Sequence, residues 1–213
     1  MLVFAYLCLL LFMIAFILYL VDLAHKRCPI KIKRFYFIVL IAMAVRYMVL
    51  IAAVLFEKQK LIYQLRYVYN INIICIPLIG LSVFYIFLRE QNRSFDYNYT
   101  FMFLMSLGYI ILCLVYKNKI VIDNDFGFIV SFKEMLTPSL IYLIIMASIT
   151  VLSLILMDKP FANSWGMRML MAASMVVVIE FIIFMGGKRI FPYPIIGEAV
   201  MLIAALKSIL TFK

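Results

Sequence analysis

Seven long apolar segments follow one another along the chain and leave little room for anything else. They cover approximately residues 2–21, 35–56, 67–88, 99–116, 135–157, 169–185 and 192–210. A helix needs roughly 20 apolar residues to cross a bilayer, so each segment is predicted to span a membrane. The sequence therefore predicts an all-α membrane protein, built as one seven-transmembrane helix bundle over residues 1–213.

The composition excludes several classes of protein. Of the 213 residues, 68% are hydrophobic and 14% are charged. A soluble domain is nearer half apolar and about a quarter charged. A water-soluble chain of this composition would have to expose large apolar patches. We therefore expect membrane lipids to surround the chain, and we exclude a cytosolic enzyme, a nucleic-acid-binding module and a secreted disulfide scaffold.

The charged residues predict an orientation and a location. Five basic residues lie between the first two apolar segments: Lys26, Arg27, Lys31, Lys33 and Arg34. Cytoplasmic loops of membrane proteins carry an excess of Lys and Arg, so this loop is placed inside. With seven spans, the N-terminus is then outside and the C-terminus inside. The residue usage is typical of an AT-rich bacterial genome, which predicts the bacterial cytoplasmic membrane.

The loop between the fourth and fifth segments has the alternation of a β-structure. Residues 119–123 alternate with Ile and Val, and residues 126–132 continue the pattern after Asn124 and Asp125. This pattern predicts two short strands joined by a tight turn. The orientation above places this hairpin on the extracellular face.

Three charged residues stand out well inside the predicted spans, where charge is costly and usually faces the bundle interior or water. They are Arg46, Glu180 and Glu198. At a rise of 1.5 Å per residue, both glutamates lie roughly 9–10 Å below the outer surface, and Arg46 lies roughly 15 Å below it. Antiparallel packing of the last two helices can bring the glutamates together, with Arg46 reaching toward their layer.

These residues allow three interpretations. The first is a buried Arg–Glu pair that only fixes helix packing. The second is an outward-facing polar pocket that binds a small molecule from the outer face, with Arg66 at its mouth to balance surplus negative charge. The third is a proton relay. The residues predicted to line that pocket are Arg46, Tyr47, Tyr69, Asn70, Asn72, Glu180, Tyr193 and Glu198.

No catalytic or metal-binding constellation is visible. The single histidine, His25, lies in the basic loop three residues from Cys28, without a third partner for nucleophilic catalysis. The four cysteines form no CxxC pair and are expected to be buried or lipid-facing thiols. We therefore expect no metal, no cofactor and no enzymatic activity.

The layout resembles the seven-helix N-terminal sensor region of bacterial histidine kinases. The matching features are a basic first loop after an outside-start helix, the aromatic and arginine-bearing run at residues 61–69 with Pro77 after it, a hairpin at 120–132, and a proline-containing entry to the last helix at 192–198. In that family catalytic domains follow the seventh span, whereas this sequence ends at Lys213. The resemblance therefore implies a stand-alone sensor bundle without an output domain.

Three functions follow from these observations as hypotheses. The first is a receptor-like sensor that passes its signal to a separate protein partner. The second is a structural or assembly subunit of a larger membrane complex, because the loops are short and small residues in the last two segments suit close helix contacts. The third is a small proton-coupled transporter that uses Glu180 and Glu198.

Overall fold

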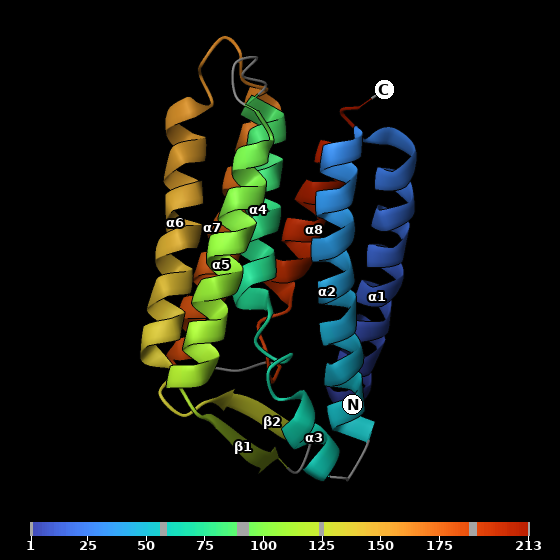
Figure 1. Cartoon of the computed structure of the whole chain (residues 1–213), viewed down its shortest axis with the longest axis vertical. Helices are drawn as coiled ribbons and strands as arrows, with labels where there is room; N and C mark the ends of the chain where they lie inside the picture. Colours follow the sequence, from blue (N-terminus) through green and yellow to red (C-terminus); the bar gives the residue numbers. More distant parts are fainter. Residues whose placement is uncertain (1, 56–58, 89–93, 124–125, 188–190, 213) are drawn as a thin grey trace.

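The computed structural model of the chain is a bundle of long helices with a strand pair at one end (Figure 1). It describes residues 2–55, 59–88, 94–123, 126–187 and 191–212. Its elements in chain order are α1 (Leu2–Arg27), α2 (Ile30–Leu55), α3 (Gln59–Leu65), α4 (Asn72–Leu88), α5 (Asp96–Val115), β1 (Asn118–Asp123), β2 (Gly127–Phe132), α6 (Leu136–Leu156), α7 (Ser164–Met185) and α8 (Ile196–Ile209).

The two ends of the bundle differ. The short helix α3, the two strands and the start of α1 lie together at one end, which we call the hairpin end (Figure 1). The turn between α1 and α2 and the C-terminal residues lie at the opposite end, which we call the far end. The long helices run between these two ends along the long axis of the molecule.

Five helices, α1, α2, α5, α6 and α7, are long and apolar enough to cross a membrane. Helix α4 is also apolar but has 17 residues, and α8 has 14. These helices agree with the predicted all-α, multi-pass membrane protein. The count of seven spans and their orientation stay predictions.

The basic loop predicted between the first two spans is almost entirely helical, which corrects its assignment as a loop. Helix α1 continues to Arg27 and α2 begins at Ile30, so only Cys28 and Pro29 lie outside helices. Lys and Arg are good helix formers, and cations are favoured in the last turn of a helix. The proline then ends α1, because the residue before a proline is disfavoured in the α conformation.

The third predicted span begins later than expected. Helix α4 starts at Asn72 rather than near residue 67, and residues 66–71 form turns. The separate short helix α3, which the sequence did not predict, precedes these turns. Asn and Tyr side chains at 69–72 thus lie at a helix entry, where polar groups find partners that a continuous apolar helix does not offer.

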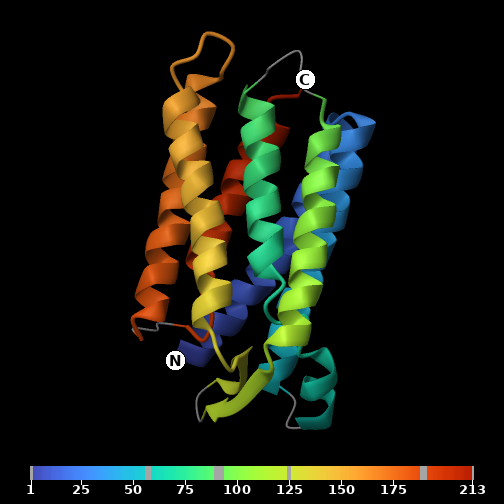
Figure 2. The ribbon, with the colours of Figure 1, turned by 60° about the vertical axis from the view of Figure 1, so that its left-hand side comes forward.

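Helix α4 is the centre of the bundle. It packs against α2, α5, α6, α7 and α8, and 14 of its 17 residues are buried. Helix α5 is its opposite, because only Asn98 and Tyr109 among its 20 residues are buried. Figure 2 shows α4 between α5 and α6. Helices α4 and α5, which follow one another in the chain, are thus the most buried and the most exposed of the long helices.

The strands β1 and β2 pair antiparallel, with Ile120 opposite Val130, in the loop where the sequence predicts them. Residues 124 and 125 of the predicted turn lie outside the described residues. Gly127 opens β2 with a φ of 71°, a left-handed conformation suited to glycine. A Cβ here would also lie 2.8 Å from the carbonyl oxygen of Ala53, so the missing side chain lets the hairpin approach α2 closely.

Candidate functional site

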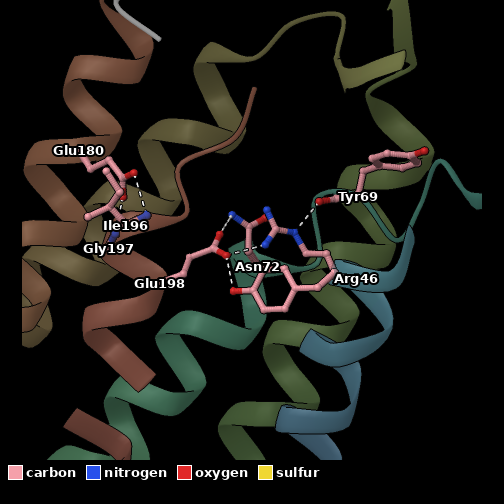
Figure 3. Close-up of polar contacts among 8 residues, drawn as sticks. Arg46, Tyr69, Asn72, Glu180, Ile196, Gly197 and Glu198 are labelled. Carbon is pink, nitrogen blue, oxygen red and sulfur yellow. Dashed lines mark hydrogen bonds and ion pairs between the residues drawn. The ribbon is translucent and has the colours of Figure 1, made fainter. Parts of the chain in front are cut away.

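A buried ion pair joins the second helix to the last one. Nη1 of Arg46, in the middle of α2, lies 2.6 Å from Oε2 of Glu198, in the first turn of α8 (Figure 3). The two side chains are 0% and 2% exposed. Because taking two charges out of water is costly, such a pair needs further hydrogen bonds to be stable.

The carboxylate of Glu198 receives those hydrogen bonds. The hydroxyl of Tyr47 donates to Oε2 over 2.7 Å, and Nδ2 of Asn72 donates to Oε1 over 2.9 Å. Figure 3 shows Arg46 of α2 and Asn72, the first residue of α4, both directed at the carboxylate. One glutamate thus joins α2, α4 and α8 through three donors. We call Arg46, Tyr47, Asn72 and Glu198 the polar cluster.

Arg46 has two further kinds of partner. Its Nε donates to the carbonyl oxygen of Tyr69 over 2.8 Å, and its Cζ lies 5.5 and 5.8 Å from the ring centroids of Tyr47 and Tyr193. Aromatic faces at this distance attract a cation. Its Nη2, however, is buried and has no hydrogen-bond partner. The cluster therefore holds one unused donor.

Glu180 binds main-chain groups rather than a charged side chain, although the sequence predicts it at a depth similar to that of Glu198. Its Oε1 accepts from the backbone N–H of Ile196 over 3.0 Å, and its Oε2 accepts from that of Gly197 (Figure 3). The first N–H groups of a helix lack intrahelical partners and carry partial positive charge, so a carboxylate stabilises them. Glu180 of α7 thus caps α8 from a neighbouring helix.

Tyr193 joins the hairpin to the segment that leads into α8. Its hydroxyl donates to the carbonyl oxygen of Val130 over 3.0 Å and accepts from the N–H of Val130 over 2.9 Å. It thereby pairs with main-chain groups of β2. Its ring centroid also lies 6.3 Å from that of Tyr69, whose hydroxyl points away from Arg46 in Figure 3.

A small cavity of about 30 Å³ lies under the hairpin, beside the polar cluster. Asn70, Asn72, Tyr193 and Val130 are among the residues that line it. This volume suits a water molecule, which needs at least about 10–15 Å³ and two or more polar partners. Nδ2 of Asn70 is buried here without a partner. The cavity at the position of the predicted pocket therefore has room for a water molecule but not for a larger ligand.

The structure does not gather all nine predicted residues in one place. Arg46, Tyr47, Asn72 and Glu198 contact one another, with Tyr69 and Tyr193 against Arg46. Asn70 lines the cavity, and Glu180 bonds to main-chain groups of α8. Arg66 lies on the surface, where its guanidinium stacks on the rings of Tyr63 and Tyr67.

Sequence reasoning missed the partners that are main-chain groups. These are the carbonyl oxygen of Tyr69 and the N–H and carbonyl of Val130. No side-chain pattern marks such groups in a sequence. It also missed the hydrogen bond of 2.9 Å between Tyr36 of α2 and Ser208 of α8 near the far end, because neither residue is charged.

The site offers hydrogen-bond donors and one neutralised charge pair. Among the described residues, no group of three or more His, Cys, Asp or Glu side chains is placed to hold a metal ion. A scan of protein-family models finds no match to the chain, and a search of curated proteins finds none either.

Proposed function

We propose that this chain is a seven-span membrane receptor that responds to a small molecule at its hairpin end and passes the signal to a separate protein. The observation that carries the proposal is the pair of hydrogen bonds between Tyr193 and Val130. They tie the hairpin to the segment five residues ahead of Glu198, which the polar cluster holds. The resemblance of the sequence to histidine kinase sensor regions motivates the same proposal.

The charge distribution supports an outward-facing hairpin end. The basic residues 26–34 belong to the end of α1 and the start of α2, which meet at the far end. Because Lys and Arg are concentrated on the cytoplasmic side of membrane proteins, the far end is the cytoplasmic one in this proposal. A ligand would then arrive from outside, and the partner would bind inside a bacterial cytoplasmic membrane.

Helix α8 is the element suited to carry the signal. Near the hairpin end it is held by Glu198 and by the cap from Glu180. Near the far end Ser208 holds it to Tyr36 of α2. If the hairpin displaces Tyr193, the start of α8 moves with it. The other end of α8 lies at the far end, which faces the partner in this proposal. Bundle interfaces of this kind change between discrete arrangements rather than deforming continuously.

The free donors indicate what a ligand would bring. Nη2 of Arg46 and Nδ2 of Asn70 are buried donors without partners, so a ligand with an oxygen acceptor would satisfy them. The cavity must widen to admit anything larger than water. The ligand therefore drives a change only if it binds the widened state more tightly than the closed one.

The connection between the hairpin and α8 is tested by hydrogen–deuterium exchange on the purified protein. Tyr193→Phe keeps the ring and removes both hydrogen bonds to Val130, so we expect faster exchange at 196–209. Tyr99→Phe is the matched control, because it removes a hydroxyl that donates to the carbonyl of Lys31 at the other end of the bundle. Unchanged exchange in α8 of Tyr193→Phe would refute the connection.

The partner is tested by recovering the tagged protein from its native membrane in mild detergent, followed by mass spectrometry. Stoichiometric recovery of a signalling protein supports the receptor, and weaker recovery with Tyr193→Phe than with Tyr99→Phe would link the partner to the hairpin. Recovery of the chain alone would argue against the proposal.

A second candidate is a structural subunit of a larger membrane assembly. The observation that favours it is α5, on which all residues but Asn98 and Tyr109 keep some exposure. A partner helix would cover that face. Recovery with several membrane proteins, unchanged by Tyr193→Phe, would support this candidate over the receptor.

A further inference from the structure

We propose that the seam between α4, α5 and α6 binds one acyl chain of a membrane phospholipid, with Asn98 as the polar anchor of its ester end. This proposal does not depend on the receptor function. The seam contains a hollow of about 570 Å³ near the far end. That volume lies within the roughly 300–1,000 Å³ typical of ligand sites.

Asn98 is the residue that points to a ligand. Its side chain lies in the first turns of α5 and lines the hollow. It is 8% exposed, and its Nδ2 has no hydrogen-bond partner. The large majority of buried polar side-chain atoms in proteins do have a partner. A ligand oxygen at the mouth of the hollow would supply the missing acceptor.

Most of the remaining surface of the hollow is apolar, with Leu81 and Phe84 of α4, Phe101 of α5 and Leu152 of α6 among its walls. The exposed Ser94 and the side chains of Tyr85 and Tyr97 add polar atoms. A ligand must therefore carry an oxygen acceptor at one end and a hydrocarbon body. A phospholipid has this chemistry, because an ester carbonyl begins each acyl chain. It is also the molecule that surrounds a membrane-spanning helix.

The length of the seam matches one leaflet. A second hollow of about 260 Å³ lies between the same three helices and is lined by Gly108 and Leu104 of α5 and by Ile145 of α6. Asn98 and Gly108 are ten residues apart on α5, a rise of about 15 Å. Half of a hydrocarbon core of about 30 Å is also about 15 Å. An acyl chain anchored at Asn98 thus ends near Gly108.

The test is mass spectrometry of the intact protein released from vesicles that contain equal amounts of phosphatidylglycerol and phosphatidylethanolamine. We expect the wild-type chain to retain one phospholipid. Asn98→Leu keeps the branching of the side chain at Cγ and removes the donor. Because one hydrogen bond contributes about 1 kcal/mol and tenfold in affinity is about 1.4 kcal/mol, we expect about a fivefold loss of retained lipid.

Gly108→Phe fills the tail end of the seam and should also reduce retention. A Cβ at Gly108 meets no atom within 4 Å, so this variant adds a side chain to open space rather than to packed atoms. Ser106→Phe is the matched control, because Ser106 is exposed on the same helix and is not among the residues lining either hollow. It should retain lipid like the wild type.

Three results would overturn the proposal. One is a folded wild-type chain that leaves the vesicles without phospholipid. Another is equal retention by the wild type, Asn98→Leu and Gly108→Phe. The third is a change of oligomeric state in Gly108→Phe with unchanged lipid, which would show that a second copy, and not a lipid, occupies the seam.

Discussion

Replacing Glu198 by glutamine is the most direct test of the polar cluster. Glu198→Gln keeps the size of the side chain but removes the negative charge that faces Nη1 of Arg46 at 2.6 Å. The guanidinium then faces a neutral amide instead of a carboxylate, beside the carbonyl of Tyr69 and two aromatic faces. Removing one partner of a buried ion pair leaves an uncompensated charge and costs about 3–5 kcal/mol of unfolding free energy.

A double variant separates the charge from the packing. Arg46→Met fills much of the arginine volume without a charge, and in Arg46→Met/Glu198→Gln no buried charge remains. The single amide oxygen at position 198 can still accept from Tyr47, and the amide of Asn72 can turn so that its oxygen accepts from the new NH2 group. A buried pair replaced by neutral groups is often as stable as the original. We therefore expect the double variant to be more stable than Glu198→Gln alone.

Thermal unfolding in a fixed detergent measures this difference. For a domain of this length, 1 kcal/mol shifts Tm by about 2–4 °C, so Glu198→Gln should lower Tm by about 6–20 °C. Asp22→Asn is the matched control, because Asp22 pairs with Lys26 at the same 2.6 Å while 58% of its side chain is exposed. Exposed pairs contribute about 0–1 kcal/mol, so that change should be small.

The reasoning fails in two cases. If Glu198→Gln and Asp22→Asn lower Tm equally, burial does not make the Arg46 pair important. If the double variant is as unstable as the sum of both single variants, the two side chains do not interact energetically, because coupled residues give non-additive changes.

Three further predictions concern the packing and chemistry around the last helix and the first turn. Gly197→Ala should lower the free energy of unfolding by about 1–3 kcal/mol, because the added Cβ would lie 2.8 Å from Cα of Val177. Gly108→Ala is its control in the same unfolding assay. It has open space around it and should be neutral or stabilising by up to about 1 kcal/mol. Glu180→Ala should cost about 1–2 kcal/mol, since it removes the cap of α8, and an unchanged Tm would contradict that assignment. Burial raises the pKa of the Cys28 thiol to about 11, so in a variant without the other cysteines its alkylation by a maleimide should keep accelerating as pH rises toward 11; a plateau near pH 9 would refute the shift.

The positions of the helices follow from the sequence because the bilayer imposes them. Backbone groups in lipid must be satisfied within the segment, so a run of about 20 apolar residues is helical whatever its neighbours are. Prolines then mark two boundaries, at Pro29 before α2 and at Pro194 before α8. This argument did not predict that α1 continues through its basic residues. Hydropathy marks only the part of a helix that lies in lipid, whereas the helix itself can extend into water.

The depth of the charged residues could also be counted from the sequence, but their partners could not. Depth depends only on the rise per residue along a helix. Contact depends on the rotation of each helix about its axis and on which helices are neighbours. Glu180 and Glu198 were therefore equivalent in the sequence, whereas in the structure one binds Arg46 and the other binds the N–H groups of Ile196 and Gly197.

Composition and the lengths of the apolar segments alone thus determined that this chain folds mainly into long apolar helices that could cross a membrane, because lipid selects helices locally. Only the tertiary structure decided that α4 lies at the centre, that Tyr193 binds main-chain groups of Val130, and that Asn98 faces a hollow beside α5. These features arise from contacts between segments far apart in the chain. Their free energies depend on geometry between helices, which no local stretch of sequence encodes.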